Sequence, residues 1–466
     1  MSVVVIGYGM AGARCAADLQ AFGVKTTVLG AEPHRAYNRI LLSNLLAGKV
    51  DEAGVELPDP VTDVRVGVTA VAIDRTAQAV SCSDGSVVPY EHLVLATGAD
   101  AWVPPVPGLS ASGDRVAVFR TLDDCRRILS WAGSARTAVV LGGGLLGLEA
   151  ARGLATRGLD VTVVEVGHLM ERQIDPDASV ILSATLAALG ITVHTGVLTR
   201  GCTTSSTGVT LELSSGVSVS ADLLVVACGV RPATGVAISA GLAVDRGIVV
   251  DDRMRTSDRH ISAIGDCAQH RGEVGGLVAP AWAQAGVVAR IVSGIEPLAA
   301  YHPAPVVTRL KANGIDLAAM GSLADDGDDL RFADPASGTY ARLRIRDDRL
   351  AAAVLLGDNP LVGQIIQLFD RGAPVPADRR ALLLGRSLGG PASAQAAPTP
   401  ALMPDAATVC QCNTVNKGAL VRAWRDGCRD ASALAERTRA TSGCGTCVDA
   451  VRGIADWLST QEGVSA

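Results

Sequence analysis

Four cysteines near the C-terminus have the type and spacing of metal ligands. They form a Cys-x-Cys pair and a Cys-x-x-Cys pair, and the residues are Cys410, Cys412, Cys444 and Cys447. Four thiolates are the usual ligand set of a [2Fe–2S] cluster. A set of four sulfurs also suits structural zinc, so the spacing alone leaves iron and zinc open.

Two glycine-rich turns suit a second kind of chemistry, the binding of dinucleotides. Each has the pattern Gly-x-Gly-x-x-Gly after an apolar, strand-like run; the glycines are Gly7, Gly9 and Gly12 in the first turn and Gly142, Gly144 and Gly147 in the second. The first glycine allows a tight turn, the second lets the backbone approach a pyrophosphate, and the third lets the next helix pack on the strand. That helix directs its N-terminal N–H groups at the phosphates.

Carboxylates lie near the ends of the strands that follow these turns. Glu165 ends the run 161–165 (VTVVE). An acid at this place hydrogen-bonds the ribose hydroxyls and repels a 2′-phosphate, so the second turn predicts NADH rather than NADPH. After the first turn, Gly30 occupies the usual place of this acid, and Glu32, two residues later, is the candidate ribose ligand. Glu149 either contacts the nicotinamide end or complements a helix N-terminus.

The elements that would position these residues follow from the apolar pattern. Over residues 1–300, short β-branched runs alternate with longer Ala/Leu-rich stretches, which predicts α/β units with parallel sheets. The segments beginning at Ser2 and Thr137 repeat one order of strand, glycine turn, helix and strand. We therefore expect two dinucleotide-binding domains.

After residue 296 the chain no longer alternates strand-like and helix-like segments in the same way. Residues 296–386 contain strand-like segments and one helix-like segment and predict a separate α+β domain. A linker rich in Pro, Ala and Ser follows at 387–407. Beyond it, short helix-like segments predict a small helical domain that carries the cysteines.

Composition excludes several classes of protein. Of the 466 residues, 48% are hydrophobic and 19% charged, which excludes disorder for most of the chain. The net charge is −6 without a basic block, so nucleic acid is not an expected partner. Apolar runs such as 223–226 are of strand length and no signal peptide is apparent, so we expect no membrane segment and a cytoplasmic location, where thiols stay reduced.

Three further segments resemble the glutathione-reductase-like class of FAD/NAD(P)H oxidoreductases. Residues 93–98 (LVLATG) resemble the segment that returns the chain past FAD, and 226–232 (VACGVRP) resemble the later crossing strand. Residues 261–266 (ISAIGD) resemble the motif whose Asp binds the ribityl chain of FAD. The resemblance implies FAD contacts by Thr97 and Asp266. The FAD motifs bracket the second glycine turn, an interleaved order that is highly specific for this class.

Other segments are similar to the N-terminal half of NADH-dependent assimilatory nitrite reductase large subunits and to the electron-transfer subunit of bacterial assimilatory nitrate reductases. They are residues 37–48 (YNRILLSNLLAG), 168–175 (HLMERQID) and 308–316 (TRLKANGID). This resemblance covers essentially the whole chain and implies that Arg39 lies against FAD. The cysteine spacing is similar to that of bacterioferritin-associated-ferredoxin-like domains. With a flavin upstream, it favours a [2Fe–2S] cluster over zinc.

These resemblances imply a division of the chain. The expected segments are an FAD-binding domain in two parts (1–112 and 236–295), an NAD-binding domain between them (113–235), an α+β interface domain (296–386), the linker (387–407) and a [2Fe–2S] domain (408–460).

The implied activity is that of an NADH-dependent flavin oxidoreductase that transfers electrons. NADH gives two electrons together as hydride, whereas a [2Fe–2S] cluster accepts one at a time, so FAD serves as the converter between them. The sequence has no cysteine between Cys15 and Cys82, so disulfide reductase activity is not expected. The siroheme-binding domains of full nitrite reductases do not follow before Ala466. We therefore expect a separate nitrate or nitrite reductase subunit as the electron acceptor.

Two other functions stay open from the sequence. One is an NADH-dependent reductase for a ferredoxin or an iron-storage protein. The other is a redox-sensing flavoprotein with structural zinc on the cysteine tail. The sequence also leaves open the oligomeric state, a homodimer included, and the distance between cluster and flavin.

Overall fold

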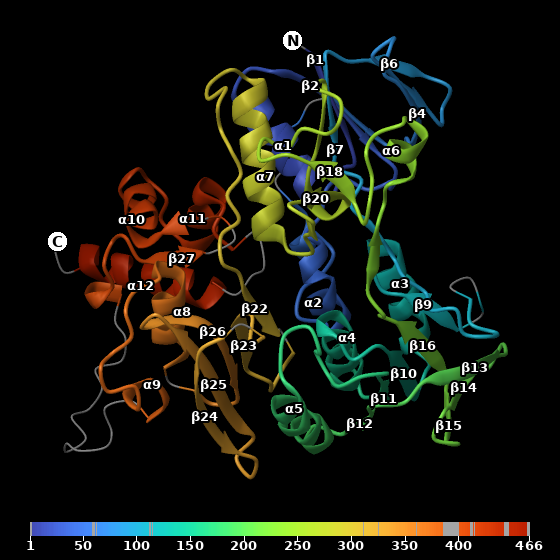
Figure 1. Cartoon of the computed structure of the whole chain (residues 1–466), viewed down its shortest axis with the longest axis vertical. Helices are drawn as coiled ribbons and strands as arrows, with labels where there is room; N and C mark the ends of the chain where they lie inside the picture. Colours follow the sequence, from blue (N-terminus) through green and yellow to red (C-terminus); the bar gives the residue numbers. More distant parts are fainter. Residues whose placement is uncertain are drawn as a thin grey trace.

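A computed structural model of the chain describes residues 2–57, 61, 63–110, 113, 115–310, 312–324, 326–359, 361–384, 400–410, 413, 415–441 and 447–463. It has four units (Figure 1). We call them the outer unit (within 2–110 and 235–299), the inserted unit (within 113–234), the antiparallel unit (within 305–384) and the C-terminal unit (within 400–463). Among the helices of the described residues, none is long and apolar enough to span a membrane.

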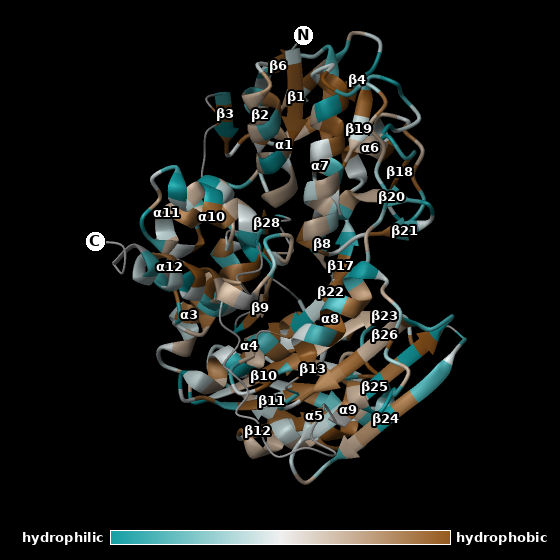
Figure 2. Ribbon diagram, turned by 90° about the vertical axis from the view of Figure 1, so that its left-hand side faces the viewer, coloured by the Kyte–Doolittle hydropathy of each residue, from teal (hydrophilic) through white to brown (hydrophobic). Residues whose placement is uncertain are grey.

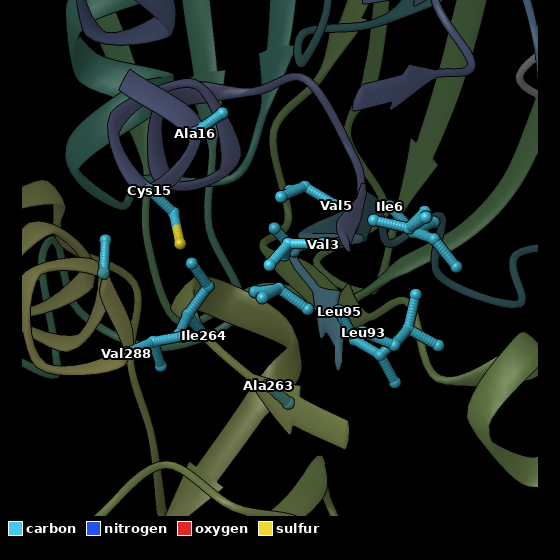
Figure 3. Close-up of a cluster of buried hydrophobic side chains, with 14 of the residues drawn as sticks. Val3, Val5, Ile6, Cys15, Ala16, Leu93, Leu95, Ala263, Ile264 and Val288 are labelled. Carbon is cyan, nitrogen blue, oxygen red and sulfur yellow. The ribbon is translucent and has the colours of Figure 1, made fainter. Parts of the chain in front are cut away.

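The outer unit is built on a five-stranded parallel sheet. In sheet order its strands are β19 (Ile261–Ala263), β7 (His92–Leu95), β1 (Ser2–Ile6), β2 (Lys25–Gly30) and β3 (Asp63–Val66). Helices α1 (Met10–Ala21) and α7 (Val278–Val292) pack against each other beside it. Figure 3 shows the shared core, where Cys15 and Val288 from these helices gather with Ile264 beside the strands.

Smaller elements complete the outer unit. They are β4 (Ala70–Asp74), β5 (Ala79–Cys82), β6 (Val87–Pro89), β8 (Ala99–Ala101), β18 (Ile248–Val250), β20 (Ala268–His270), β21 (Glu273–Val274), α2 (Leu42–Leu46), α6 (Gly235–Ser239), η1 (Arg39–Leu41), η2 (Ala53–Val55) and η3 (Gly265–Cys267). Strand β8 pairs with β17 (Val230–Pro232), so the two crossings between the outer and inserted units lie side by side.

The inserted unit repeats the plan of the outer one. Its parallel sheet has the order β12 (Ile191–His194), β11 (Asp160–Val164), β10 (Thr137–Leu141), β16 (Leu223–Val226) and β9 (Val116–Val118). Its remaining elements are α3 (Leu122–Ala132), α4 (Leu145–Thr156), α5 (Pro176–Ala188), β13 (Thr199–Thr204), β14 (Val209–Leu213) and β15 (Ser218–Ala221). Its central strands β10 and β16 are apolar (Figure 2) and buried on both faces. Helices α3, α4 and α5 cover one face of the sheet, and the small sheet β13–β14–β15 covers the other.

The antiparallel unit packs on the inserted unit. Its sheet has the order β22 (Val307–Leu310), β23 (Leu317–Gly321), β26 (Arg349–Leu356), β25 (Thr339–Arg346) and β24 (Asp328–Asp334), with helices α8 (Val362–Arg371) and α9 (Ala381–Leu384). Tyr340, Val354 and Leu356 from this sheet share a hydrophobic cluster with Leu182 and Leu186 of α5.

The C-terminal unit is small and mostly helical. It contains η4 (Pro400–Leu402), β27 (Thr408–Cys410), β28 (Val415–Asn416), α10 (Lys417–Arg425), α11 (Ala431–Thr438) and α12 (Val448–Gly463). Part of the predicted linker belongs to this packing, because Met403 contacts the unit's hydrophobic cluster and Ala407 is buried. The remainder of the linker, 387–399, lies outside the described residues. The predicted fold class, with two parallel-sheet α/β units, an antiparallel region and a small helical C-terminal region, is confirmed.

Candidate functional site

One large cavity lies where all four units meet. Its volume is about 1330 Å³. Of the predicted site residues, it is lined by Gly7, Gly9, Glu32, Arg39, Thr97 and Asp266. The other units contribute Leu145, Leu146 and Glu149, then Val307 and Arg309, and finally Thr408 and Asn413. The cavity therefore connects the first glycine turn, the helix that follows the second turn, and the cysteine-bearing unit.

In the first glycine turn, backbone atoms closely surround the first and third glycines, whereas the middle glycine has open space beside it. Gly7 has a φ of +107°, and a Cβ there would lie 2.1 Å from the carbonyl oxygen of Ala96. A Cβ on Gly12 would lie 1.9 Å from the carbonyl oxygen of Gly7. A Cβ on Gly9, in contrast, meets no atom within 4 Å. Backbone contacts thus require the outer two glycines, and the middle one faces open space in the cavity.

The second glycine turn repeats this geometry. A Cβ on Gly142 (φ +115°) would lie 2.4 Å from the carbonyl oxygen of Ala227, and one on Gly147 would lie 1.9 Å from that of Gly142. A Cβ on Gly144 meets nothing within 4 Å.

The helices after both turns start without a side-chain cap. The N-cap residues of α1 and α4 are Gly9 and Gly144, and neither helix has a side-chain hydrogen bond to its cap. By comparison, Asp175 caps α5. Open helix N-termini beside an uncovered glycine fit the phosphates of a dinucleotide, because the first N–H groups of a helix need an acceptor.

Glu165 lies against the second turn. Its Oε2 accepts a hydrogen bond from the N–H of Gly143 at 2.5 Å, and its Oε1 accepts one from the N–H of Gly167 at 3.1 Å. The carboxylate is partly exposed at the end of β11. It therefore braces the turn while it keeps access to solvent.

The segment 168–175 supports the same turn. Met170 adopts a φ of +50°, and its N–H donates to the carbonyl oxygen of Gly143 at 2.9 Å. Asp175 ends the segment, caps α5 and accepts the hydroxyl of the buried Tyr340 at 3.0 Å on each carboxylate oxygen. The antiparallel unit is thereby connected to the second glycine turn, a link that sequence reasoning missed.

Glu32 and Arg39 lie together on the cavity wall. Arg39 Nη2 is 2.5 Å from Glu32 Oε1, and the Tyr37 hydroxyl donates to Glu32 Oε2 at 2.7 Å. The Arg39 guanidinium also lies 5.5 Å from the centre of the Tyr37 ring. Burial raises the pKa of Tyr37 well above its usual value, so its hydroxyl remains a donor. The three side chains form one polar group in the loop after β2.

Asp266 and Thr97 are positioned by contacts that cross between units. Asp266 Oδ2 pairs with Arg120 Nη2 at 2.8 Å, and Arg120 Nε donates to the carbonyl oxygen of Ala99 at 3.0 Å. The Thr97 hydroxyl donates to the carbonyl oxygen of Ala233 at 2.6 Å. Arg120 was not among the predicted residues, since no motif surrounds it. The sequence offered one signal for Arg120: it is a cationic residue that lies between β8 and β17, the two strands that cross between the units.

Two of the four predicted cluster ligands can be placed. Cys410 at the end of β27 is 1% exposed, and Cys447 before α12 is 5% exposed. A hydrogen bond with the Cys447 thiol lowers the pKa of Cys410 to about 6, although burial acts in the opposite direction. A thiol that ionises easily suits a metal ligand. Cys412 and Cys444 lie outside the described residues, and among the described residues no three metal-binding side chains gather.

Comparison with known families now identifies the chain. The sequence model of the pyridine nucleotide-disulphide oxidoreductase family matches residues 1–285. The chain belongs to this family. Residues 305–372 match the rubredoxin NAD+ reductase C-terminal domain, and residues 408–457 match the BFD-like [2Fe-2S] binding domain. This pyridine nucleotide-disulphide oxidoreductase thus carries an iron–sulfur domain at its C-terminal end.

Curated relatives extend the family assignment. The chain is 34% identical to a nitrite reductase [NAD(P)H] of Bacillus subtilis (strain 168), over 96% of this chain and 56% of the relative. It is 33% identical to the assimilatory nitrate reductase electron transfer subunit of the same organism, over 99% of this chain and 60% of the relative. The chain therefore spans little more than half the length of these relatives.

A solved structure has the same fold over most of the chain. The chain resembles the covalent putidaredoxin reductase–putidaredoxin complex with a TM-score of 0.73 and 27% identity, over 80% of this chain and 94% of that chain. The oxidoreductase is therefore an FAD/NAD(P)H-type enzyme with a [2Fe–2S] domain, related to nitrite reductases and nitrate reductase electron-transfer subunits.

Proposed function

We propose that this oxidoreductase takes hydride from NADH onto FAD and passes the electrons through its own [2Fe–2S] cluster to a partner reductase of nitrate or nitrite assimilation. The single observation that carries the proposal is the shared cavity. Residues of the first glycine turn, of the helix after the second turn and of the cysteine-bearing unit all line it. When bound, FAD and the cluster supply two-electron and one-electron chemistry respectively, so their neighbourhood at one cavity makes a relay.

The outer unit would hold FAD. Gly7, Gly9 and Gly12 shape the turn, and the N-terminus of α1 would bind the pyrophosphate. Glu32 offers a carboxylate to the adenosine ribose, with Arg39 fixed beside it. Asp266 and Thr97 also line the cavity and would contact the flavin side, where the Arg120 ion pair orients the Asp266 carboxylate.

The inserted unit would hold NADH. Gly142, Gly144 and Gly147 form the second turn, and Glu165 presents its carboxylate to the ribose hydroxyls. A 2′-phosphate at the same place would meet the negative charge of Glu165, which supports NADH over NADPH. The apolar residues Leu145 and Leu146 line the cavity and would help to exclude water when nicotinamide and flavin are bound.

The C-terminal unit would hold the cluster through Cys410, Cys412, Cys444 and Cys447. The match to a BFD-like [2Fe-2S] domain supports iron over zinc. Names of the relatives support a reductase of nitrate or nitrite as the acceptor, because one of them is an electron transfer subunit. Likeness to the ferredoxin reductase for the CYP199A2 system of Rhodopseudomonas palustris, with a TM-score of 0.70 and 29% identity, supports a ferredoxin as the second candidate acceptor.

The test is anaerobic NADH oxidation by the FAD- and cluster-loaded chain, with dyes and a panel of candidate acceptors: nitrate reductase, nitrite reductase and a ferredoxin. We expect Cys410→Ser to retain most of the NADH-to-dye activity and to lose transfer to the protein acceptor. Cys428→Ser is the matched control, since Cys428 lies in the same unit outside the ligand pattern. Normal transfer by Cys410→Ser, or a protein that holds zinc and no iron after anaerobic reconstitution, would refute the proposal.

A further inference from the structure

We propose that the C-terminal unit docks reversibly on helix α1 through an ionic contact between Asp18 and Arg439, and that Asn413 aligns the Cys410 edge of that unit with the cavity wall. The inference rests on the proposed function and adds the interface through which flavin and cluster would communicate. Figures 1 and 2 both show the C-terminal unit beside α1.

The C-terminal unit has a hydrophobic core of its own. Its buried apolar side chains cluster with one another, and each described member of that cluster lies between Met403 and Leu458. Lys417 is an internal anchor, with its ammonium 4.7 Å from the Trp457 ring centre and its Nζ donating to the carbonyl oxygen of Met403. A unit with a separate core and a polar interface moves relative to its neighbours unless the interface is large and apolar.

The receiving surface on α1 is held in place by contacts within the outer unit. Arg14 Nε donates to both carboxylate oxygens of Asp18, at 3.1 and 2.8 Å, one helical turn away. The Arg14 guanidinium lies 5.5 Å from the ring centre of Trp282, whose Nε1 donates to the carbonyl oxygen of Met10 at 2.9 Å. Arg14, Asp18 and Trp282 all line the cavity, so the docking surface is continuous with the flavin site.

Two polar contacts join the C-terminal unit to α1. Arg439 Nη1 lies 3.5 Å from Asp18 Oδ1, and Arg14 Nη1 donates to Asn413 Oδ1 at 3.2 Å. The Nδ2 of Asn413 donates to the Cys410 sulfur at 3.7 Å and to the carbonyl oxygen of Arg439. Asn413 is thus a positioning residue, since it joins the receiving arginine, the docking arginine and a ligand thiol.

The strength of this contact suits a transient interface. The Arg439 and Asp18 side chains are 35% and 18% exposed, so water and salt reach the pair. Partly exposed ion pairs are weak and screened by salt. Asp18 attracts both Arg14 and Arg439, but burial and repulsion from the Arg14 cation lower the pKa of Arg439 and so offset part of this attraction. The pair therefore favours docking at low ionic strength and releases the unit easily.

The experiment follows cluster reduction by NADH in the full chain loaded with FAD and iron, by anaerobic stopped-flow absorbance. We expect Arg439→Gln to slow cluster reduction by about two- to fivefold at low salt, the range that a partly exposed ion pair supports. Flavin reduction should keep its wild-type rate. Arg439→Lys should restore most of the cluster rate. For wild type, raising ionic strength from about 0.01 M to about 1 M, which shortens the Debye length from about 30 Å to about 3 Å, should also slow cluster reduction.

Arg437→Gln is the matched control, since Arg437 is exposed in the last turn of α11, two residues before Arg439 at the helix C-cap, and its loss changes the net charge equally. Small-angle X-ray scattering should show a larger radius of gyration for Arg439→Gln than for Arg437→Gln. Docking through Arg439 is overturned if the two variants have equal cluster rates at low and at high salt. If NADH fails to reduce the wild-type cluster at all, the proposed function fails instead, so the two failures are distinguishable.

Discussion

Replacement of Gly9 by alanine separates cofactor binding from folding. Gly9 has a φ of −79° and a ψ of −171°, a conformation that alanine adopts readily. The added Cβ meets no protein atom within 4 Å. Stability of the FAD-free protein should therefore change by no more than about 1 kcal/mol. The methyl group would fill the space that a pyrophosphate needs, so the affinity for FAD should fall at least about tenfold, or about 1.4 kcal/mol.

Alanine at two other glycines provides the comparison. At Gly12 the Cβ would lie 1.9 Å from the Gly7 carbonyl oxygen, well inside the 3.4 Å at which ordinary contact begins. Helix α1 would have to shift, and overpacking of this kind costs about 1–3 kcal/mol or more of unfolding free energy. At Gly144 the Cβ again meets nothing within 4 Å, so that variant should keep FAD and bind NADH more weakly.

The assay has three readouts: the FAD-to-protein ratio after gel filtration, the Kd for added FAD, and the KM for NADH in dye reduction. Urea unfolding of the FAD-free proteins checks that Gly9→Ala and Gly144→Ala are folded. If Gly9→Ala binds FAD with wild-type affinity, the open face of the first turn does not receive the pyrophosphate. If Gly144→Ala has a normal KM for NADH, the assignment of the second turn is refuted.

Three other substitutions test separate parts of the structure. Glu165→Gln should raise the NADPH-to-NADH ratio of kcat/KM by about tenfold, because it removes the charge that repels a 2′-phosphate; an unchanged ratio would reject this role. Tyr340→Phe should lower the free energy of unfolding in urea by about 1.5–3 kcal/mol, since its hydroxyl donates to the buried Asp175. Tyr90, a buried tyrosine of the outer unit, provides the control, and a loss no larger than that of Tyr90→Phe would contradict the prediction. Burial, with a smaller effect of His260, lowers the pKa of His92 from 6.5 to about 4. The unfolded chain therefore binds this proton more tightly, so the contribution of His92 should destabilise the fold increasingly as pH drops from 6.5 towards 4 and should be absent above 6.5. In His92→Gln, urea midpoints at pH 7 and pH 5 should differ less than in wild type.

Local features of the fold could be predicted from the sequence. Strand, glycine turn and helix are adjacent in the chain, so the local pattern at residues 7–12 is enough to predict the backbone geometry of the turn. The structure shows the same backbone contacts at 142–147. The interleaved order of the motifs assigned residues 1–112 and 236–295 to one expected domain, and in the structure β19 from the later segment pairs with β7 from the earlier one. These inferences needed only the period of the apolar residues, the spacing of the motifs and the conformational preferences of the turn residues.

Contacts between distant side chains could not be predicted in this way. Arg120 with Asp266, and Tyr340 with Asp175, lie on different units, and their pairing depends on how the units pack. The same holds for Arg14 with Asn413, which are 399 positions apart. The chain has 41 Lys and Arg residues, and a single sequence does not show which acidic or polar residue each of them contacts. Glu32 was recognised as a carboxylate out of its usual place, but its ion pair with Arg39 emerged only from the structure.

The pairing of β7 with β19 also has a consequence for how the chain is made. Strand β7 ends at Leu95 and β19 begins at Ile261, so the first sheet keeps an unpaired edge until the ribosome has produced the whole insertion. Domains fold as units during synthesis, and pairings across long loops form slowly. The inserted unit should therefore fold first, and the nascent outer unit should expose the edge of β7 as a site for chaperones in the meantime.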